Sequence, residues 1–232
     1  MKYLILPFLV LLSPHAFAES EIGASTETLT KEDTTIGRFS QFFSLEAGRF
    51  QPRSVTIGNG DYNFQYGFDS TASALTEAGW SIRLSSLFGA GSLSLVENLG
   101  YTSFSGSAIN AAKASEDLHV NVLAIDSRFR YSADWLPWQY LIPFVDGGYQ
   151  YSFYNQNGGS DLESAQGGVG NLVAGAGVRL WVNRWQFNHG DFETKYSAIP
   201  FFITVRYSHI YPNNQNLDMG SDVWMGGMEI AL

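Results

Sequence analysis

Apolar and polar residues alternate in eight separate segments of the chain. The clearest segment is residues 73–87. Within it, Trp80 and Ile82 fall on one face of an extended backbone, and Arg83 falls on the other. A period of two residues predicts a β-strand with one apolar and one polar face. The eight predicted strands are residues 40–51, 73–87, 92–104, 118–131, 141–154, 169–182, 199–210 and 221–232.

The polar faces carry arginine and carboxylate side chains near the middle of the strands, for example Arg128 and Asp126. In a soluble barrel such as a lipocalin, the apolar faces would line a ligand cavity and these charges would face water. In a transmembrane barrel, the apolar faces would meet lipid and the charges would fill the interior. The alternation fits both arrangements, so other features must decide between them.

The N-terminal residues have the form of a secretory signal peptide. Lys2 precedes an apolar run, residues 3–12, that is too short to cross a bilayer as a helix. Ala16 and Ala18 form a small-x-small cleavage site, which predicts that the exported protein begins at Glu19. The next residues are rich in Ser, Thr and Glu and predict a flexible segment. The predicted organisation is a signal peptide at 1–18, a flexible periplasmic leader at 19–38 and an outer-membrane β-barrel at 39–232.

Aromatic residues gather near the ends of the predicted strands, as they do at the two interfaces of a transmembrane barrel. Polar loops also alternate with shorter connections, although the connection at residues 183–198 is longer than this rule expects. With the signal peptide, these features favour an all-β fold: an eight-stranded antiparallel up-and-down transmembrane β-barrel in the cell outer membrane. The expected periplasmic belt is Phe43, Phe88, Phe129, Tyr131, Trp135, Trp138, Trp181 and Phe201, and the expected outer belt is Tyr101, Phe104, Tyr151, Phe153, Tyr207 and Trp224.

Composition limits the function further. The chain has no cysteine, which excludes disulfides and a lipid-acylated N-terminal cysteine, and its formal net charge of −9 argues against nucleic acid as a partner. His119, His189 and His209 lie in separate segments, so no metal-ligand spacing occurs and no cofactor is expected. Acidic residues outnumber basic ones in the predicted external loops. These loops could bind lipopolysaccharide through divalent cations or contact a protein partner, and a solvated surface is the simpler expectation.

The chain resembles the small eight-stranded outer-membrane barrels of the OmpX, OmpA and OmpW type. The signal peptide, the alternation in residues 78–85, the segment 127–131 followed by 143–151, and the last strand carry this resemblance. The last strand alternates Met228, Ile230 and Leu232, and it ends on leucine where the family commonly has an aromatic residue. The resemblance implies insertion by the barrel-assembly machinery and contact with outer-membrane lipid and lipopolysaccharide.

The inward-facing charges say most about mechanism, because basic and acidic residues balance. They fall in a slab on the order of 15–20 Å deep, inside a barrel only just wide enough for its side chains. Buried charges must pair, so we expect an interlocked ion-pair network that mostly closes the lumen of an envelope surface or permeability protein. The alternative is a narrow channel for small solutes. The network residues are Glu46, Glu77, Arg83, Asp126, Arg128, Arg130, Asp146, Arg179, Arg206 and Glu229.

One charge does not fit this arrangement. Glu97 falls on the outward face of its strand, where a charged side chain would meet lipid at a cost. Either a β-bulge near Val96 turns Glu97 inward, or the carboxylate pairs sideways with a neighbour on the outer wall.

An enzymatic alternative comes from a second resemblance. His209 and Asp222 are similar to the base and acid of lipid A 3-O-deacylases, in which a serine two residues after the histidine is the nucleophile. Here that position holds Tyr211, and Ser208 lies on the other side of the histidine. A base without a hydroxyl in register has nothing to activate, so no enzymatic activity is expected.

Overall fold

The computed structural model describes residues 40–50, 55–59, 62–67, 73–86, 90–108, 117–136, 139–157, 165–183, 199–211 and 220–232. The signal peptide, the leader and most of the connection 183–198 lie outside these residues and stay predictions. No helix of the described residues is long and apolar enough to span a membrane. The described strands are β1 (Gln41–Phe50), β2 (Val55–Asn59), β3 (Tyr62–Gly67), β4 (Ser73–Ser86), β5 (Ser92–Ala108), β6 (Asp117–Ser132), β7 (Leu141–Asn157), β8 (Ala165–Trp181), β9 (Phe201–Tyr211) and β10 (Ser221–Ala231).

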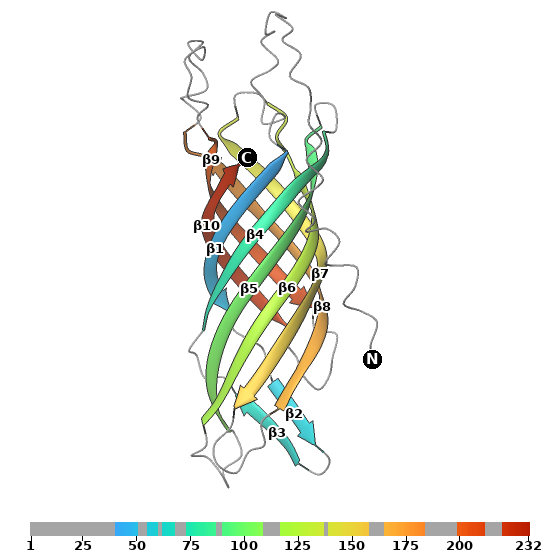
Figure 1. Cartoon of the computed structure of the whole chain (residues 1–232), viewed down its shortest axis with the longest axis vertical. Helices are drawn as coiled ribbons and strands as arrows, with labels where there is room; N and C mark the ends of the chain where they lie inside the picture. The colour runs from blue at the N-terminus through green and yellow to red at the C-terminus, as the bar shows by residue number, and fades with distance from the viewer. Residues whose placement is uncertain are drawn as a thin grey trace, which may run out of the picture. The chain divides into compact units, whose positions relative to one another are not determined.

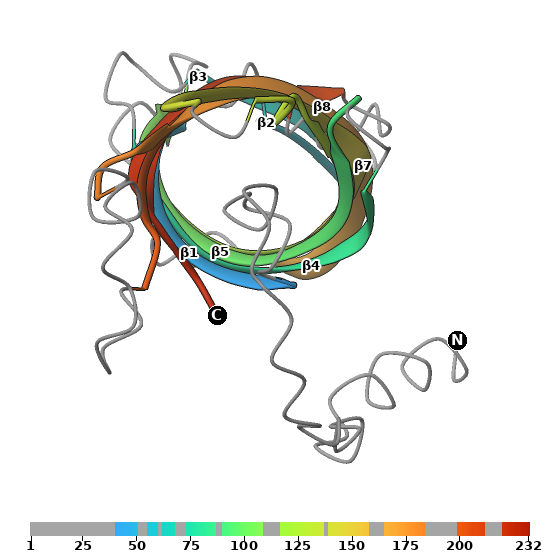
Figure 2. The ribbon, with the colours of Figure 1, turned by 90° about the horizontal axis from the view of Figure 1, so that it is seen from above.

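Eight of these strands form a closed barrel (Figures 1 and 2). They are hydrogen-bonded in the order β1, β4, β5, β6, β7, β8, β9 and β10, and β10 pairs back with β1. All neighbours are antiparallel, and each barrel strand lies beside the next barrel strand in sequence. The predicted eight-stranded up-and-down barrel is therefore confirmed. We call the end where β1 begins and β10 ends the terminal end, and the opposite end, which carries β2 and β3, the hairpin end (Figure 1).

The long first connection contains secondary structure that the hydrophobic pattern did not predict. β2 and β3 form an antiparallel hairpin in which Asn59 pairs with Tyr62, and β3 joins the sheet through Tyr66 opposite Ala108 of β5. The eight predicted strands include no strand between residues 52 and 72, so this hairpin was not predicted. Only Gly60 and Asp61 separate the two strands, and such a pair of residues is typical of a hairpin turn.

Four neighbouring strands are longer than predicted. β5, β7 and β8 each have 17 residues and β6 has 16, whereas β9 and β10 have 11 each. Because β9 ends at Tyr211 opposite Leu172, the first residues of β8 pair with β7 alone. The extra residues therefore project beyond β9 at the hairpin end. Of the outward residues described in these extra parts, Ser105, Asn155 and Gln166 are polar. No apolar alternation therefore marks the extra parts in the sequence.

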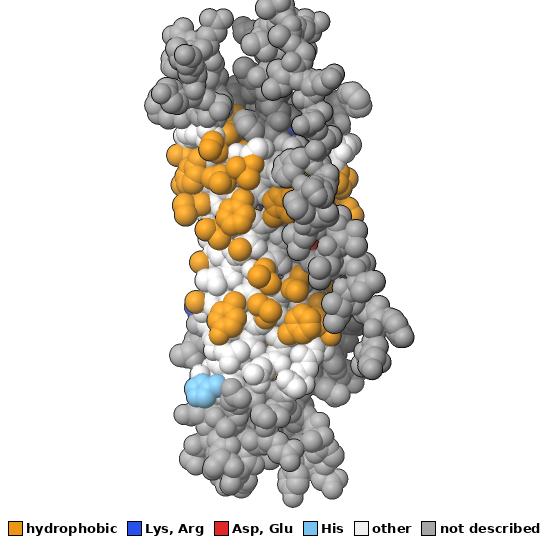
Figure 3. All heavy atoms as spheres, in the orientation of Figure 1, with side chains coloured by type: hydrophobic (Ala, Val, Ile, Leu, Met, Phe, Trp, Pro, Cys, Tyr) orange, Lys and Arg blue, Asp and Glu red, His pale blue; other side chains and the backbone are white. Residues whose placement is uncertain are grey.

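The outer wall of the barrel is apolar, and charged side chains are buried in its interior. Leu45, Leu172 and Trp224 are 50–63% exposed, whereas Arg128 and Arg206 are at most 2% exposed. Hydrophobic side chains accordingly gather on the barrel wall in Figure 3. This is the arrangement expected when the solvent around the barrel is hydrocarbon.

Two aromatic residues lie on the other face from the one expected. Trp181 is 1% exposed and Phe104 is 4% exposed, so both point into the barrel and neither belongs to an outer belt. The period of two explains this, because Trp181 lies between Leu180 and Val182, whose side chains face outward. Two further expected belt residues, Phe88 and Trp138, lie outside the described residues.

Apolar clusters fill the interior near both ends of the barrel. At the terminal end, the Trp181 and Phe202 rings lie 5.6 Å apart and the Phe42 and Phe202 rings lie 6.3 Å apart. This terminal cluster consists of Phe42, Ile142, Trp181, Phe202 and Ala231. The hairpin-end cluster consists of Phe50, Leu75, Phe104, Val120, Val122, Val169, Val173, Ile210, Val223 and Met225.

Candidate functional site: the charged layer of the lumen

Nine of the ten predicted lumen residues lie between the two apolar clusters, on inward positions of the strands, and are at most 7% exposed. The tenth, Arg83, lies at the terminal end, and its side chain is 8% exposed. Glycines on neighbouring strands make room for them. A Cβ atom at Gly175 would come within 2.6 Å of the Asp146 carboxylate, so this position of β8 accommodates only glycine without displacing the charge.

The centre of the layer is a carboxylate shared by two arginines. Asp146 of β7 accepts hydrogen bonds from Nε and Nη2 of Arg130 at 3.3 and 3.1 Å, and its other oxygen lies 3.5 Å from Nη1 of Arg128. Arg128 also donates to Asp126, two residues before it on β6. Because residues i and i+2 of a strand share a face, this pair needs no partner strand.

A second carboxylate extends the network toward the terminal end. Glu229 of β10 lies 2.6 Å from Arg179 of β8 and 3.5 Å from Arg130 of β6. The pairs thus cross the lumen between strands that are not neighbours in the barrel. The connected series is Asp126, Arg128, Asp146, Arg130, Glu229 and Arg179.

A separate group joins two carboxylates to one arginine. Nη2 of Arg206 on β9 pairs with Glu77 of β4 and lies 3.0 Å from Glu46 of β1. The two glutamates are directly opposite each other in the β1–β4 register. Like charges in such a position repel, and the shared guanidinium offsets this repulsion.

The remaining predicted residue, Arg83, has a partner that the sequence analysis missed. Its guanidinium lies 3.0 Å from Asp134, whose carboxylate also accepts a hydrogen bond from Ser92. Asp134 follows β6 in a connection, where no strand period predicts the direction of a side chain. The only signal in the sequence was that Asp134 follows closely after the end of a strand.

The charged layer also contacts the terminal cluster. The Arg179 guanidinium lies 5.5 Å from the Phe42 ring centroid and 5.9 Å from that of Phe202. A cation over an aromatic face is attracted by the ring quadrupole, so the two layers stabilise each other.

Glu97 stays on the outer wall. The register of β5 with β6 runs without interruption through Val96, Glu97 and Asn98, and the bulge in this region lies between Arg83 and Ser85 of β4 instead. Ser127 of the neighbouring strand donates a hydrogen bond of 2.7 Å to the Glu97 carboxylate. The sideways pair, and not the bulge, is therefore the arrangement present.

His209 and Asp222 come together, but none of the serines that the structure describes joins them. His209 Nδ1 lies 2.6 Å from Asp222, on the outer wall near the hairpin end. Ser208 faces the lumen, is 2% exposed and accepts a hydrogen bond from Arg128. The pair has the geometry of a base held by an acid, and its nearest serine in sequence lies on the other side of the barrel wall.

Metal binding finds no support in the described residues, which contain no group of three or more His, Cys, Asp or Glu side chains with suitable geometry. The described carboxylates of the lumen face arginines, which would repel a cation.

No protein-family model matches the chain, and no curated protein sequence matches it. Among solved structures, the outer membrane protein OprG from Pseudomonas aeruginosa matches with a TM-score of 0.54 and 10% identity, over 84% of this chain and 96% of that chain. The N-terminal β-barrel domain of Pseudomonas aeruginosa OprF has a TM-score of 0.45 and 13% identity, over 84% of this chain and 98% of that chain. The attachment invasion locus protein Ail of Yersinia pestis has a TM-score of 0.45 and 11% identity, over 84% of this chain and 99% of that chain. From its closed barrel and its likeness to OprG, the chain has the fold of the small eight-stranded outer-membrane β-barrel proteins.

Proposed function

We propose that the protein is an integral outer-membrane barrel whose lumen is closed, and that it serves the envelope as a surface protein and not as a pore or an enzyme. The apolar outer wall and the barrel fold support a position in the outer membrane. The sequence of residues 1–18 supports export by a cleaved signal peptide.

The observation that carries this proposal is the three-layer filling of the lumen. Two apolar clusters enclose the charged layer, and the charges within it are paired across the barrel. Removing one partner of a buried pair costs about 3–5 kcal/mol, so thermal fluctuations rarely separate the pairs. A hydrated ion passing through such an interior would have to disturb both the ring clusters and the ion pairs.

Planar-bilayer recording and a solute-uptake assay test the closed lumen. The protein is purified from outer membranes, and its mobility on gels before and after boiling establishes that the barrel is folded. We expect heat-modifiable mobility, little conductance and no uptake of small sugars above the level of protein-free vesicles. Large, stable conductance steps from heat-modifiable protein would contradict the closed lumen and favour the narrow channel.

The hydrolase alternative is tested separately, by incubation of the folded protein with lipid A. We expect no release of fatty acid, because the hydroxyl beside His209 on the outer wall belongs to a tyrosine and Ser208 faces inward. Release of one acyl chain that is lost in the variant His209→Ala would restore the enzymatic reading.

A further inference from the structure

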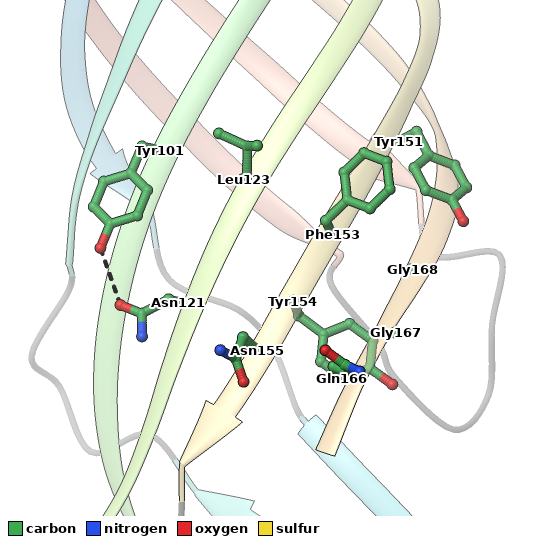
Figure 4. A pocket seen from close by; sticks show the side chains of 10 residues that line it. All are labelled: Tyr101, Asn121, Leu123, Tyr151, Phe153, Tyr154, Asn155, Gln166, Gly167 and Gly168. Atoms are coloured by element: carbon green, nitrogen blue, oxygen red, sulfur yellow. Dashed lines mark hydrogen bonds between the residues drawn. The ribbon is translucent and has the colours of Figure 1, made fainter. Parts of the chain in front are cut away.

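The outer wall of β5, β6 and β7 carries a shallow hollow near the hairpin end (Figure 4). Its apolar part is one row across three strands, in which Tyr101 is opposite Leu123 and Leu123 is opposite Phe153. These side chains are 41–50% exposed, and the hollow has a volume of about 550 Å³. On the β8 side, Gly168 lies opposite Phe153, and the Tyr151 ring lies over this glycine and also lines the hollow.

The next row toward the hairpin end is polar and uncharged. Asn121 is opposite Ser103 on one side and Asn155 on the other, and Asn155 is opposite Gln166 of β8. Tyr101 donates a hydrogen bond of 3.0 Å to Asn121 and so joins the two rows. Figure 4 shows the amides of Asn121, Asn155 and Gln166 beyond the aromatic row, nearer the ends of the strands.

The outer wall thus changes from apolar to amide side chains between two neighbouring rows, two residues apart along the strands. This change marks a fixed height along the barrel. If the apolar wall lies in hydrocarbon, as the proposed function requires, the amide row lies at the surface of the outer leaflet. A molecule that fits both rows must be amphipathic, with a hydrocarbon part on the aromatic row and a hydrogen-bonding head on the amides.

The absence of charge selects the kind of head group. None of the described residues of the two rows is lysine or arginine, the residues that bind phosphate. Amides can donate and accept hydrogen bonds at once, which matches hydroxyl groups. We propose that this hollow is a glycolipid site, with the acyl chain on Leu123 and Phe153 and the sugar against Asn121 and Asn155.

The test measures lipid binding to the purified protein by native mass spectrometry, with rough lipopolysaccharide and phosphatidylglycerol as probes and EDTA present. We expect tighter binding of the lipopolysaccharide than of the phospholipid. The double variant Asn121→Ala/Asn155→Ala should lose about tenfold in lipopolysaccharide affinity, the loss expected for two neutral hydrogen bonds, and keep its phospholipid affinity.

Two tyrosines of equal exposure provide a matched pair of variants. Tyr101, at 50% exposed, lines the hollow, whereas Tyr211, at 49% exposed, lies on β9, two strands from β7, and does not line it. We expect Tyr101→Ala to weaken lipopolysaccharide binding and Tyr211→Ala to leave it unchanged. Equal weakening by both variants, equal affinity for both lipids in the wild-type protein, or no effect of the asparagine double variant would overturn the site.

EDTA separates this site from the acidic loops. Binding through divalent cations would disappear with EDTA, and that result would also overturn a direct glycolipid site. Heat-modifiable mobility of each variant reports whether the barrel is folded. A folded protein in the membrane without glycolipid preference would remove this inference alone, whereas loss of heat-modifiable mobility in the wild-type protein would remove the proposed function.

Discussion

At the scale of single residues, Arg206 holds two glutamates of neighbouring strands. We expect Glu77→Gln to change the free energy of unfolding by about 1 kcal/mol or less, because Glu46 keeps its cation and the repulsion between the two carboxylates disappears. We expect Arg206→Met to lower it by about 3–5 kcal/mol, because two buried carboxylates lose the arginine that pairs with both of them. Urea unfolding in lipid vesicles measures both. Equal losses from the two variants would contradict the shared-guanidinium arrangement.

The outward carboxylate leads to an opposite expectation. We expect Glu97→Leu to raise the free energy of unfolding by about 1 kcal/mol, since leucine suits a lipid-facing position better than a carboxylate. We expect Ser127→Ala to lower it in the wild-type protein, where it removes the hydrogen bond to Glu97, and to have little effect beside Glu97→Leu. A double-mutant cycle by urea unfolding gives the coupling between the two residues, and a coupling of zero would mean that the hydrogen bond contributes nothing.

Residue by residue, the sequence predicted the direction of a side chain where a strand period applied. The same period would have placed Trp181 and Phe104 inward, but their proximity to strand ends suggested belts instead. Asp134 could not be predicted, because a connection has no period. The partner of each charge was also beyond prediction, since pairs such as Arg179 with Glu229 depend on the closure and stagger of the barrel.

At the scale of elements, β7 and β8 are fitted together by tyrosines lying over glycines. The Tyr151 ring occupies the space that a side chain at Gly168 would need, whereas a Cβ atom at Gly147 would meet only ordinary contacts. We expect Gly168→Val to lower the free energy of unfolding by about 1–3 kcal/mol through overpacking. Gly147→Ala is the control and should cost less than Gly168→Val. The urea midpoints compare them, and equal costs would mean that the ring moves aside freely.

The number and order of barrel strands could be predicted, and their full lengths could not. The apolar alternation stops where the outer wall becomes polar, as at Ser103 and Asn121, although the backbone pairing continues. The β2–β3 hairpin escaped prediction for a related reason. Its alternation is short and lies in a stretch rich in turn residues, so the loop signal dominated.

At the scale of the whole molecule, the proposed closed lumen would combine two kinds of seal, the apolar clusters and the ion pairs. We expect Arg130→Ser/Glu229→Ser to leave conductance low, because the terminal cluster remains, and Trp181→Ala/Phe202→Ala to do the same, because the ion pairs remain. All four substitutions together should conduct more in planar bilayers than either pair alone, although the hairpin-end cluster still fills part of the lumen. If either pair of substitutions alone conducts as much as the combination, the lumen has a single seal.

The described ion pairs inside the barrel take all their positive charge from arginine, with no lysine. A guanidinium group keeps its proton in strongly alkaline solution, where an ammonium group begins to lose it. The ion pairs inside the barrel should therefore keep their positive charges in alkaline solution. We expect heat-modifiable mobility to persist at about pH 11. The described ion pairs of the lumen therefore contain no basic side chain that alkali would deprotonate before the others.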